Sequence, residues 1–335
     1  MEWAILIPVL LLILAAEFVN GWNDACNSIA TVVSTRVLSP MVAVIMAVGL
    51  NIVGAMSGTA VAATLGREVV QAPEGLSAAM KLLTVGSAVF SVLVWGAIAS
   101  WRGLPVSITH ALLGGLAGAG LASGGVLVWT GWSKVLLGLL FSTVFGFIAG
   151  YVLIVAILWL FRRRTPRFAR NIFGKLQILS AGFMAFSHGL NDGQQFIGVF
   201  TMALVLGGAL KEFAVTWPVI LLCSVIMGIG TSIGGWRLIR TMGTRLVRLE
   251  PHHGFAAETG AAAMITIASR FGIPLSSTHT ISTAIMGVGA SRRLSAVRWG
   301  VAGQVVMAWV LTFPLCVGVS WCTAMLVGRL YAWWH

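Results

Sequence analysis

Two short polar motifs occur twice in this chain, and both repeat at nearly the same spacing. The segment Asn20–Asn27 (NGWNDACN) is echoed by His188–Gln195 (HGLNDGQQ), with the Asn-Asp pair displaced by 168 residues. The segment Gly103–His110 (GLPVSITH) is echoed by Gly272–His279 (GIPLSSTH), with the final histidine displaced by 169 residues. Two different motifs that share one spacing indicate a chain made of two duplicated halves.

The Asn-Asp motif has the composition of a cation site. Asp24 and Asp192 supply negative charge and the neighbouring amides supply neutral oxygens, the hard ligands that ions such as Na⁺ prefer. Gly21 and Gly189 would let the backbone leave the helix and free carbonyls for the same ion. The alternative is that these acids and amides cap broken helices or join them by hydrogen bonds. The residues that we assign to a cation are Asn23, Asp24, Asn27, Asn191 and Asp192.

The Pro-x-Ser-x-Thr-His motif has the composition of a helix start that binds an anion. Pro105 and Pro274 suit a first helical turn, where a missing N–H costs nothing. The hydroxyls that follow lie beside backbone N–H groups without helical partners, and such a terminus attracts anions. Two of these half-helices facing each other at the membrane midplane would hold one tetrahedral oxyanion, whereas ordinary capping by serine and threonine is the alternative. The residues that we assign to the anion are Ser107, Thr109, Ser276, Ser277, Thr278 and Gln194.

Four further ionisable side chains accompany the motifs. Two are the closing histidines, which either orient a backbone or hydroxyl partner or carry a proton. Two are glutamates without a counterpart in the other half, which suit a third cation site, a proton carrier, or hydrogen bonding to hydroxyls inside the bundle. His188 also lacks a histidine counterpart, because Asn20 occupies the equivalent position. The four side chains are His110, His279, Glu17 and Glu258.

The composition places these motifs in a membrane. Hydrophobic residues make up 58% of the chain and charged residues only 9%, with a mean hydropathy of +0.96, whereas roughly a quarter of the residues of soluble domains are charged. The net charge of +12 comes from basic residues in the loops between apolar segments, which indicates membrane orientation rather than nucleic-acid binding. No nucleophile–base pair, metal-ligand cluster or nucleotide-binding loop occurs, so the sequence does not predict an enzyme.

Five apolar segments in each half carry the motifs. An odd number of crossings inverts the second half relative to the first, as in many secondary transporters. We expect an all-α polytopic membrane protein of two inverted repeats, with broken helices or re-entrant hairpins at the midplane. Residues 1–161 form the first repeat, 162–175 a basic linker and 176–335 the second repeat, together one transport domain. The segments are about 4–35 (interrupted), 40–65, 78–101, 104–128, 132–161, 176–207, 213–237, 255–271, 274–291 and 299–328.

The basic residues predict the orientation of these crossings. With the N-terminus outside, 15 of the 21 lysines and arginines fall on the cytoplasmic side, as the positive-inside rule requires. Both termini are therefore expected outside the cell membrane. The six basic residues on the outer face are Arg67, Lys81, Lys134, Lys211, Arg270 and Arg329.

A charge sum favours coupled transport. An oxyanion such as phosphate carries about −1.5 to −2 near neutral pH, so together with Asp24 and Asp192 the pocket would hold roughly −4. Neither motif contains a lysine or arginine. Because such an excess of buried charge is very costly, cations must enter together with the anion. The sequence thus predicts symport.

These motifs resemble the inorganic phosphate transporter (PiT) family of sodium- or proton-coupled phosphate symporters. The resemblance covers nearly the whole chain and rests on Phe18–Asn27 with Ser34–Arg36, on Ser187–Gln194, and on both Pro-x-Ser-x-Thr-His segments. It implies phosphate held by the hydroxyls of two re-entrant hairpins and cations held by the Asn-Asp segments. The sequence departs from the family at Cys26, where alanine is usual, and at Gln195, where many bacterial relatives have lysine.

The expected function is uptake of inorganic phosphate by symport with Na⁺ or H⁺, without an organic cofactor. A sulfate symporter of the same fold, a metal–phosphate complex as substrate, and an anion channel are the alternatives. Membrane lipid surrounds the protein, no nucleic acid is a partner, and a homodimer is one oligomeric form that the sequence leaves open.

Overall fold

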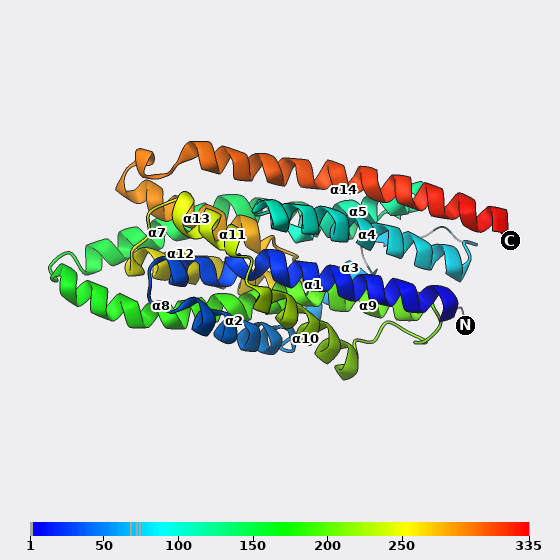
Figure 1. Cartoon of the computed structure of the whole chain (residues 1–335), viewed down its shortest axis with the longest axis horizontal. Coiled ribbons are helices and arrows are strands. Elements are labelled where there is room, and N and C mark those ends of the chain that lie inside the picture. Colours follow the sequence, from blue (N-terminus) through cyan, green and yellow to red (C-terminus); the bar gives the residue numbers. More distant parts are fainter. Residues whose placement is uncertain (1–2, 68, 72, 74, 335) are drawn as a thin grey trace.

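The protein is an elongated bundle of helices. The computed structural model describes residues 3–67, 69–71, 73 and 75–334. Both ends of the chain lie at one end of the bundle, and the turn between α7 (Gly146–Leu160) and α8 (Pro166–His188) lies at the other (Figure 1). Each half of the chain therefore runs from one end of the bundle to the other, in opposite directions, as expected for inverted repeats.

Among the described residues, the first half contains seven α-helices, one π-helical turn (η1) and two very short antiparallel strands. They are α1 (Trp3–Ser34), α2 (Pro40–Ala55), α3 (Ala60–Arg67), β1 (Val70–Gln71), α4 (Ala78–Arg102), α5 (Ile108–Ala122), β2 (Val126–Leu127), α6 (Trp129–Leu140), η1 (Phe141–Phe145) and α7 (Gly146–Leu160).

The second half repeats this plan. It consists of α8 (Pro166–His188), the π-helical turn η2 (Gly189–Gly193), α9 (Gln194–Leu206), α10 (Trp217–Ile233), α11 (Trp236–Arg240), the π-helical turn η3 (Thr241–Arg245), α12 (Pro251–Arg270), α13 (Ser277–Arg292), the short 3₁₀ helix η4 (Leu294–Ala296) and α14 (Trp299–Trp334).

Both halves place their segments in the same order. The hairpin counts as two segments, so each half has the expected five. A long motif-bearing helix comes first, then a bent pair, then a helical hairpin, then another long helix. The pair α2–α3 bends by 68° and the pair α10–α11 by 63°. Within the described residues, four helices are long and apolar enough to cross a membrane, or up to six if each bent pair counts as one span. The fold is that of an all-α polytopic membrane protein.

The linker between the halves is shorter than predicted. Only residues 161–165 lie outside a helix, and α8 begins at Pro166, in the favoured first helical position. The Thr165 hydroxyl caps this start by accepting a hydrogen bond from the backbone N–H of Phe168. Most of the basic stretch predicted as linker, 166–175, is therefore the first part of α8.

Two helical hairpins, α4–α5 and α12–α13, present the Ser/Thr motifs. At their tips Gly103 and Gly272 adopt the left-handed conformation, with φ of 73° and 67°, which glycine tolerates best. Each tip is held by the other repeat. Thr241 Oγ1 donates a hydrogen bond to the Gly103 carbonyl (3.2 Å), and Thr64 Oγ1 donates one to the Gly272 carbonyl (2.8 Å).

The prolines of the hairpins do not stand where the sequence suggested. Pro105 and Pro274 lie in the extended tips, before the helices that begin at Ile108 and Ser277. The Pro105 carbonyl accepts a hydrogen bond from Trp309 Nε1 of α14 (3.0 Å). The prediction of a proline in the first turn was wrong, because serine takes the capping position and proline stiffens the stretch before it.

The motif glycines also differ from prediction. The first segment is not interrupted: α1 runs unbroken through Gly21, and only the second copy leaves α-geometry, as the turn η2. A Cβ at Gly21 would lie 2.1 Å from the Met227 carbonyl oxygen, and one at Gly189 would lie 2.0 Å from the Asn51 carbonyl oxygen. These glycines let α1 meet α10, and η2 meet α2, at backbone contact distance. Both glycines serve close packing across the repeats. Gly21 does so without unwinding the helix, and Gly189 does so at the start of the π-helical turn.

Candidate functional site

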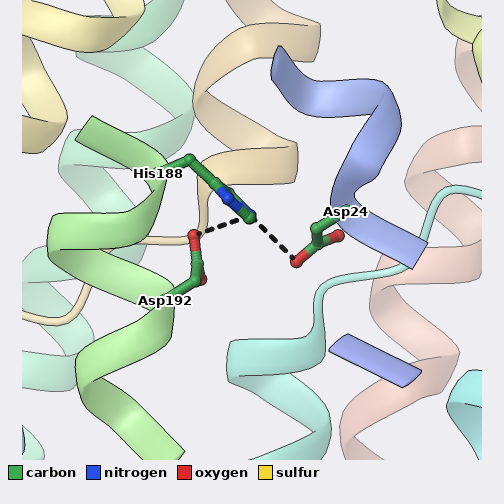
Figure 2. A group of neighbouring side chains, drawn as sticks. All are labelled: Asp24, His188 and Asp192. Carbon is green, nitrogen blue, oxygen red and sulfur yellow. Dashed lines mark ion pairs between the residues drawn. The ribbon is translucent and has the colours of Figure 1, made fainter. Parts of the chain in front are cut away.

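Packing across the repeats brings the two motif aspartates together around a histidine. Figure 2 shows His188 between Asp24 of α1 and Asp192 of η2. His188 Nε2 lies 3.4 Å from Asp192 Oδ2 and 3.8 Å from Asp24 Oδ2, and all three side chains are buried. One nitrogen and two carboxylate oxygens thus lie within 4.8 Å of one another, close enough for one ion. We call these three residues the carboxylate centre.

His188 was not assigned to the site from the sequence, although a signal was present. It precedes Asp192 by four residues, which places both side chains on one helical face. Its Nδ1 lies 3.1 Å from Asn51 Oδ1, and Asn51 Nδ2 donates to Thr231 Oγ1 (3.4 Å). The Asn51 amide oxygen therefore faces the ring and assigns the proton to Nδ1. Nε2 is left to face the two carboxylates.

The carboxylate centre requires positive charge. In the part of the chain that the structure describes, no lysine or arginine is buried. His188 Nε2 and Asp192 Oδ2 are buried without a hydrogen-bond partner there, which is costly for polar atoms. Two carboxylates and a ring nitrogen converging on one point fit a bound cation or a proton.

Each hairpin reaches the aspartate of the opposite repeat. Thr109 Oγ1, on the first hairpin, donates a hydrogen bond to Asp192 Oδ1 (3.2 Å). Thr278 Oγ1, on the second, donates to Asp24 Oδ1 (3.1 Å). The structure therefore joins the predicted anion-binding hydroxyls to the predicted cation-binding acids, and does so by symmetric contacts.

The amides at the end of each Asn-Asp motif extend this symmetry. Asn27 Nδ2 donates hydrogen bonds to Ser277 Oγ (3.1 Å) and Thr278 Oγ1 (3.0 Å). Gln195, the counterpart of Asn27, donates from Nε2 to Thr109 Oγ1 (2.9 Å) and Asp192 Oδ1 (3.2 Å). Gln195 thus belongs to the same cluster as the predicted residues.

Gln194 lies apart from the hydroxyls with which the sequence grouped it. Its Oε1 accepts a hydrogen bond from the backbone N–H of Val61 in the first turn of α3 (3.2 Å). Neighbouring helical positions point in directions roughly 100° apart, so Gln194 and Gln195 face different helices. The structure brings Gln195, not Gln194, to the hairpin tip.

The asparagines before the aspartates hold the hairpin backbones. Asn191 Nδ2 donates to the Leu275 carbonyl (2.7 Å), and its Oδ1 accepts from the Leu275 N–H (3.1 Å). With its amide turned to satisfy all neighbours, Asn23 donates in the same way to the Val106 carbonyl (3.2 Å). The alternative of hydrogen bonding between elements is thus realised at both positions.

The serines that open the half-helices are helix caps. Ser107 Oγ accepts from the backbone N–H of His110 (3.1 Å), and Ser276 Oγ accepts from that of His279 (3.2 Å). The capping alternative is therefore confirmed for both. A capping hydroxyl accepts with its lone pair, so its hydrogen stays available to a ligand.

The closing histidines lie outside the carboxylate centre. The rings of His110 and His279 meet edge to face, 4.5 Å apart. Both line a cavity of about 670 Å³ whose other walls include Leu113, Val135 and Trp309. Neither ring nitrogen of His279 has a hydrogen-bond partner among the described residues, so the expected orienting role is not realised there.

The two glutamates that have no counterpart in the other repeat also lie apart from the aspartates. Glu258 accepts hydrogen bonds from the hydroxyls of Thr31 and Ser180 and from Gln177 Nε2, which links α12 to α1 and α8. This is the predicted alternative of hydroxyl pairing inside the bundle. Glu17 accepts from Asn20 Nδ2 (2.9 Å) through one oxygen, and its other oxygen has no partner in the described structure.

Known proteins resemble this chain over nearly its full length. The model of the "Phosphate transporter family" matches residues 20–170 and 163–320. A probable low-affinity inorganic phosphate transporter of Rhizobium meliloti is 40% identical, over 96% of each chain, and one of Bacillus subtilis is 35% identical, over 94% of this chain and 95% of the relative. A solved structure described as "The sodium-dependent phosphate transporter" superposes with a TM-score of 0.89 at 24% identity, covering 97% of this chain and 99% of the other, and so shares the fold.

Proposed function

Because the chain belongs to the phosphate transporter family, we propose that it carries inorganic phosphate across the cell membrane by symport with Na⁺. The family assignment agrees with the resemblance seen in the motifs, and it makes the protein a transporter rather than an enzyme. Phosphate as cargo is supported by the names of the relatives from Rhizobium meliloti and Bacillus subtilis. Sodium as the coupling ion is supported by the description of the protein that shares the fold.

The observation that carries this proposal is the crossed pair of contacts between hairpins and aspartates. Thr109 donates to Asp192 while Thr278 donates to Asp24. The single hydrogen of each hydroxyl is shared between this carboxylate and a backbone carbonyl of the other hairpin, that of Leu275 for Thr109 and that of Val106 for Thr278. When a cation takes over the carboxylate, the hydroxyl becomes free to donate to a phosphate oxygen. Cation binding thus prepares the anion site, which is the thermodynamic coupling that symport requires.

We assign phosphate to the space between the two hairpin tips. The N-termini of α5 and α13 offer backbone N–H groups without helical partners and the positive end of two helix dipoles. The hydroxyls that surround these N–H groups add donors suited to a tetrahedral oxyanion. They belong to Ser107, Thr109, Ser276, Ser277 and Thr278.

We assign the cation to the carboxylate centre and to the amides around it. A phosphate dianion and two aspartates bring about four negative charges together, and one positive charge on His188 would offset only one of them. Entry of further cations therefore stabilises the loaded state. The cation ligands that we propose are Asp24, Asp192, Asn23, Asn27 and Asn191. To them we add His188, which faces both carboxylates, and Gln195, whose amide contacts Asp192.

The proposal is tested by uptake of labelled phosphate into proteoliposomes. An inward Na⁺ gradient should drive accumulation above equilibrium, and replacement of Na⁺ by N-methylglucamine at constant pH should abolish it. Accumulation that instead follows a pH gradient without Na⁺ would assign the coupling to H⁺. Flux that never exceeds equilibrium under either gradient would contradict symport and favour a channel.

Substrate identity needs a separate competition experiment. Sulfate is also a tetrahedral oxyanion, so the same donors can accept it. Excess unlabelled sulfate should leave phosphate uptake nearly unchanged, whereas unlabelled phosphate should suppress it. Uptake measured with and without a chelator of divalent metals distinguishes free phosphate from a metal–phosphate complex.

A further inference from the structure

A group of cationic side chains lies away from the hairpin tips. It lines a cavity of about 730 Å³ between the loop before α12, the C-terminal end of α13 and the segment before α14. The loop and the segment are joined by a bridge between Val247 and Val297 and by a hydrogen bond from the Arg298 N–H to the Leu246 carbonyl (3.1 Å). We call this cavity the arginine pocket. Its cationic lining residues are Arg248, Arg292, Arg293 and Arg298.

A buried histidine with an unpartnered hydrogen-bond donor lies at the wall of the arginine pocket. His253 lines the cavity and is only 2% exposed. Its Nδ1 accepts a hydrogen bond from the backbone N–H of Glu250 (3.1 Å), within the capping box that starts α12. Because Nδ1 is the acceptor, the ring proton lies on Nε2. That N–H has no partner among the described residues, and a buried donor without a partner is costly.

The charge of the pocket is strongly positive. Arg292 pairs with Glu250 (3.1 Å), whereas the other three guanidinium groups have no carboxylate partner in the described structure. Four arginines and one glutamate leave three net positive charges around the cavity. The first turn of α12 and the last turn of α13 both border the cavity, so their helix dipoles oppose each other there and the net positive charge comes from the arginines.

Membrane orientation alone does not account for this arrangement. An orientation signal needs basic residues near the membrane surface, and the arginines of the turn between α7 and α8 already meet that need. It requires neither a cavity nor a buried donor. Stabilisation of the α13 C-terminus explains Arg292 in its last turn and Arg293 at its C-cap, but not Arg248, Arg298 or His253.

We propose that the arginine pocket is a second anion site, which binds a phosphate group held by guanidinium forks and by the His253 N–H. Arginine forks match the oxygens of phosphate in pairs, and the cavity has the size of ordinary ligand pockets. The phosphate group comes either from free inorganic phosphate or from the headgroup of an anionic phospholipid. Because the pocket joins the first turn of α12 to the last turn of α13, its ligand ties together the arms of the hairpin whose tip carries Ser276 and Thr278.

Site-resolved arginine labelling tests this proposal on the intact protein. The protein is held in a maltoside detergent, which contains no phosphate, and is labelled with phenylglyoxal, and each arginine is quantified by mass spectrometry. One arm adds inorganic phosphate, a second adds phosphatidylglycerol without free phosphate, and a third adds chloride at matched ionic strength. We expect the labelling of Arg293 and Arg298 to fall at least five-fold in the first or second arm. Arg163 and Arg167, near the start of α8, serve as controls and should change less than two-fold.

The arms identify the source of the phosphate group. Protection by inorganic phosphate assigns a free anion, and protection by phosphatidylglycerol alone assigns a lipid headgroup. Equal labelling of Arg293 and Arg298 in all three arms overturns the proposal. Protection that extends equally to Arg163 and Arg167 also overturns it, because it would reflect general screening. These readouts need no variant and do not depend on transport.

A pair of histidine variants tests the buried donor. In His253→Asn the side-chain oxygen can still accept from the Glu250 N–H, but no donor reaches the pocket. In His253→Gln the amide nitrogen reaches the place of Nε2. A lost hydrogen bond to a charged acceptor should raise the half-protecting concentration about 10-fold or more in His253→Asn and much less in His253→Gln. Identical protection in both variants would remove His253 from the site.

Discussion

The two halves of the protein agree at the hairpin tips and differ where the motif-bearing helices face each other. Thr109 donates to Asp192 and accepts from Gln195, and Thr278 donates to Asp24 and accepts from Asn27 in the same way. One turn earlier the symmetry ends. His188 faces both aspartates, whereas its counterpart Asn20 turns to Glu17.

This difference suits the two binding tasks of the proposed function, one for the anion and one for the cation. An anion gripped from both sides needs the same donors on both hairpins, so duplication preserved them. The cation-binding acids, by contrast, lie close to one another and share one surrounding charge distribution. A single histidine reaches both, and a second copy would place two rings at one point. Under the proposed function, the symmetric contacts would hold the anion, and the asymmetric position would adjust the charge at the centre.

The largest expected effect comes from removing either charge of the symmetric pair. Asp24→Asn and Asp192→Asn should each reduce Na⁺-driven phosphate uptake about 100-fold or more, because loss of one buried charged partner typically costs 3–5 kcal/mol. Uptake in proteoliposomes checks this, with insertion verified by size-exclusion profile. Normal coupled uptake by both variants would remove the aspartates from the cation site.

The asymmetric position should give the next largest effect. His188→Asn makes the two motifs alike and removes the only ring nitrogen that faces both carboxylates. We expect uptake to fall about 10-fold or more, because changes around a bound ion typically cost about 10- to 100-fold in ion affinity or activity, and the variant removes a nitrogen that we propose as an ion ligand. His252→Asn, a histidine outside the carboxylate centre, is the matched control. Equal uptake by the two variants would show that the asymmetry has no role in transport.

The capping serines test whether the hairpins grip the anion equally. Ser107→Ala and Ser276→Ala should each raise the apparent KM for phosphate several-fold to about 10-fold, from loss of a hydroxyl donor. Loss of the cap also destabilises the helix. Glycine variants, which lack the hydroxyl but retain most capping stability, therefore serve as controls and should raise the KM as much as the alanine variants do. An unchanged KM in all four variants would leave these serines a capping role alone.

The smallest expected contrast is between two adjacent glutamines. Gln195→Ala should raise the KM for phosphate several-fold, because its amide contacts both Thr109 and Asp192. Gln194→Ala should leave the KM within about two-fold and lower stability by about 1 kcal/mol, the worth of its hydrogen bond to α3. Initial uptake rates and melting temperatures distinguish them. A larger KM effect in Gln194→Ala would restore the assignment made from sequence.

The repeated motifs predicted the fold more accurately than they predicted the side-chain contacts. Segment order, inversion and the presence of Thr109, Thr278 and both aspartates at one place follow from symmetry, which is visible in sequence. The choice between Gln194 and Gln195 depends on which helical face meets the hairpin, and a single residue changes that by about 100°.

The structural role of the motif glycines was the hardest feature to predict from sequence. A glycine beside an asparagine suits both an unwound helix and a close helix contact, and the sequence does not distinguish them. The structure shows close contact at Gly21 and Gly189, because a partner backbone lies where a Cβ would be. His188 was not predicted as a site residue for a related reason: the predicted site consisted mainly of residues that repeat, and His188 has no histidine counterpart in the other half.

The most direct test of the account is equilibrium binding of labelled phosphate to the purified protein as the Na⁺ concentration is varied. Ionic strength is held constant with N-methylglucamine, and the pH is fixed. Phosphate affinity should rise steeply with Na⁺, and the dependence should disappear in Asp24→Asn and Asp192→Asn. A phosphate affinity that is the same with and without Na⁺ in the unmodified protein would contradict the claim that the anion enters only with its cations.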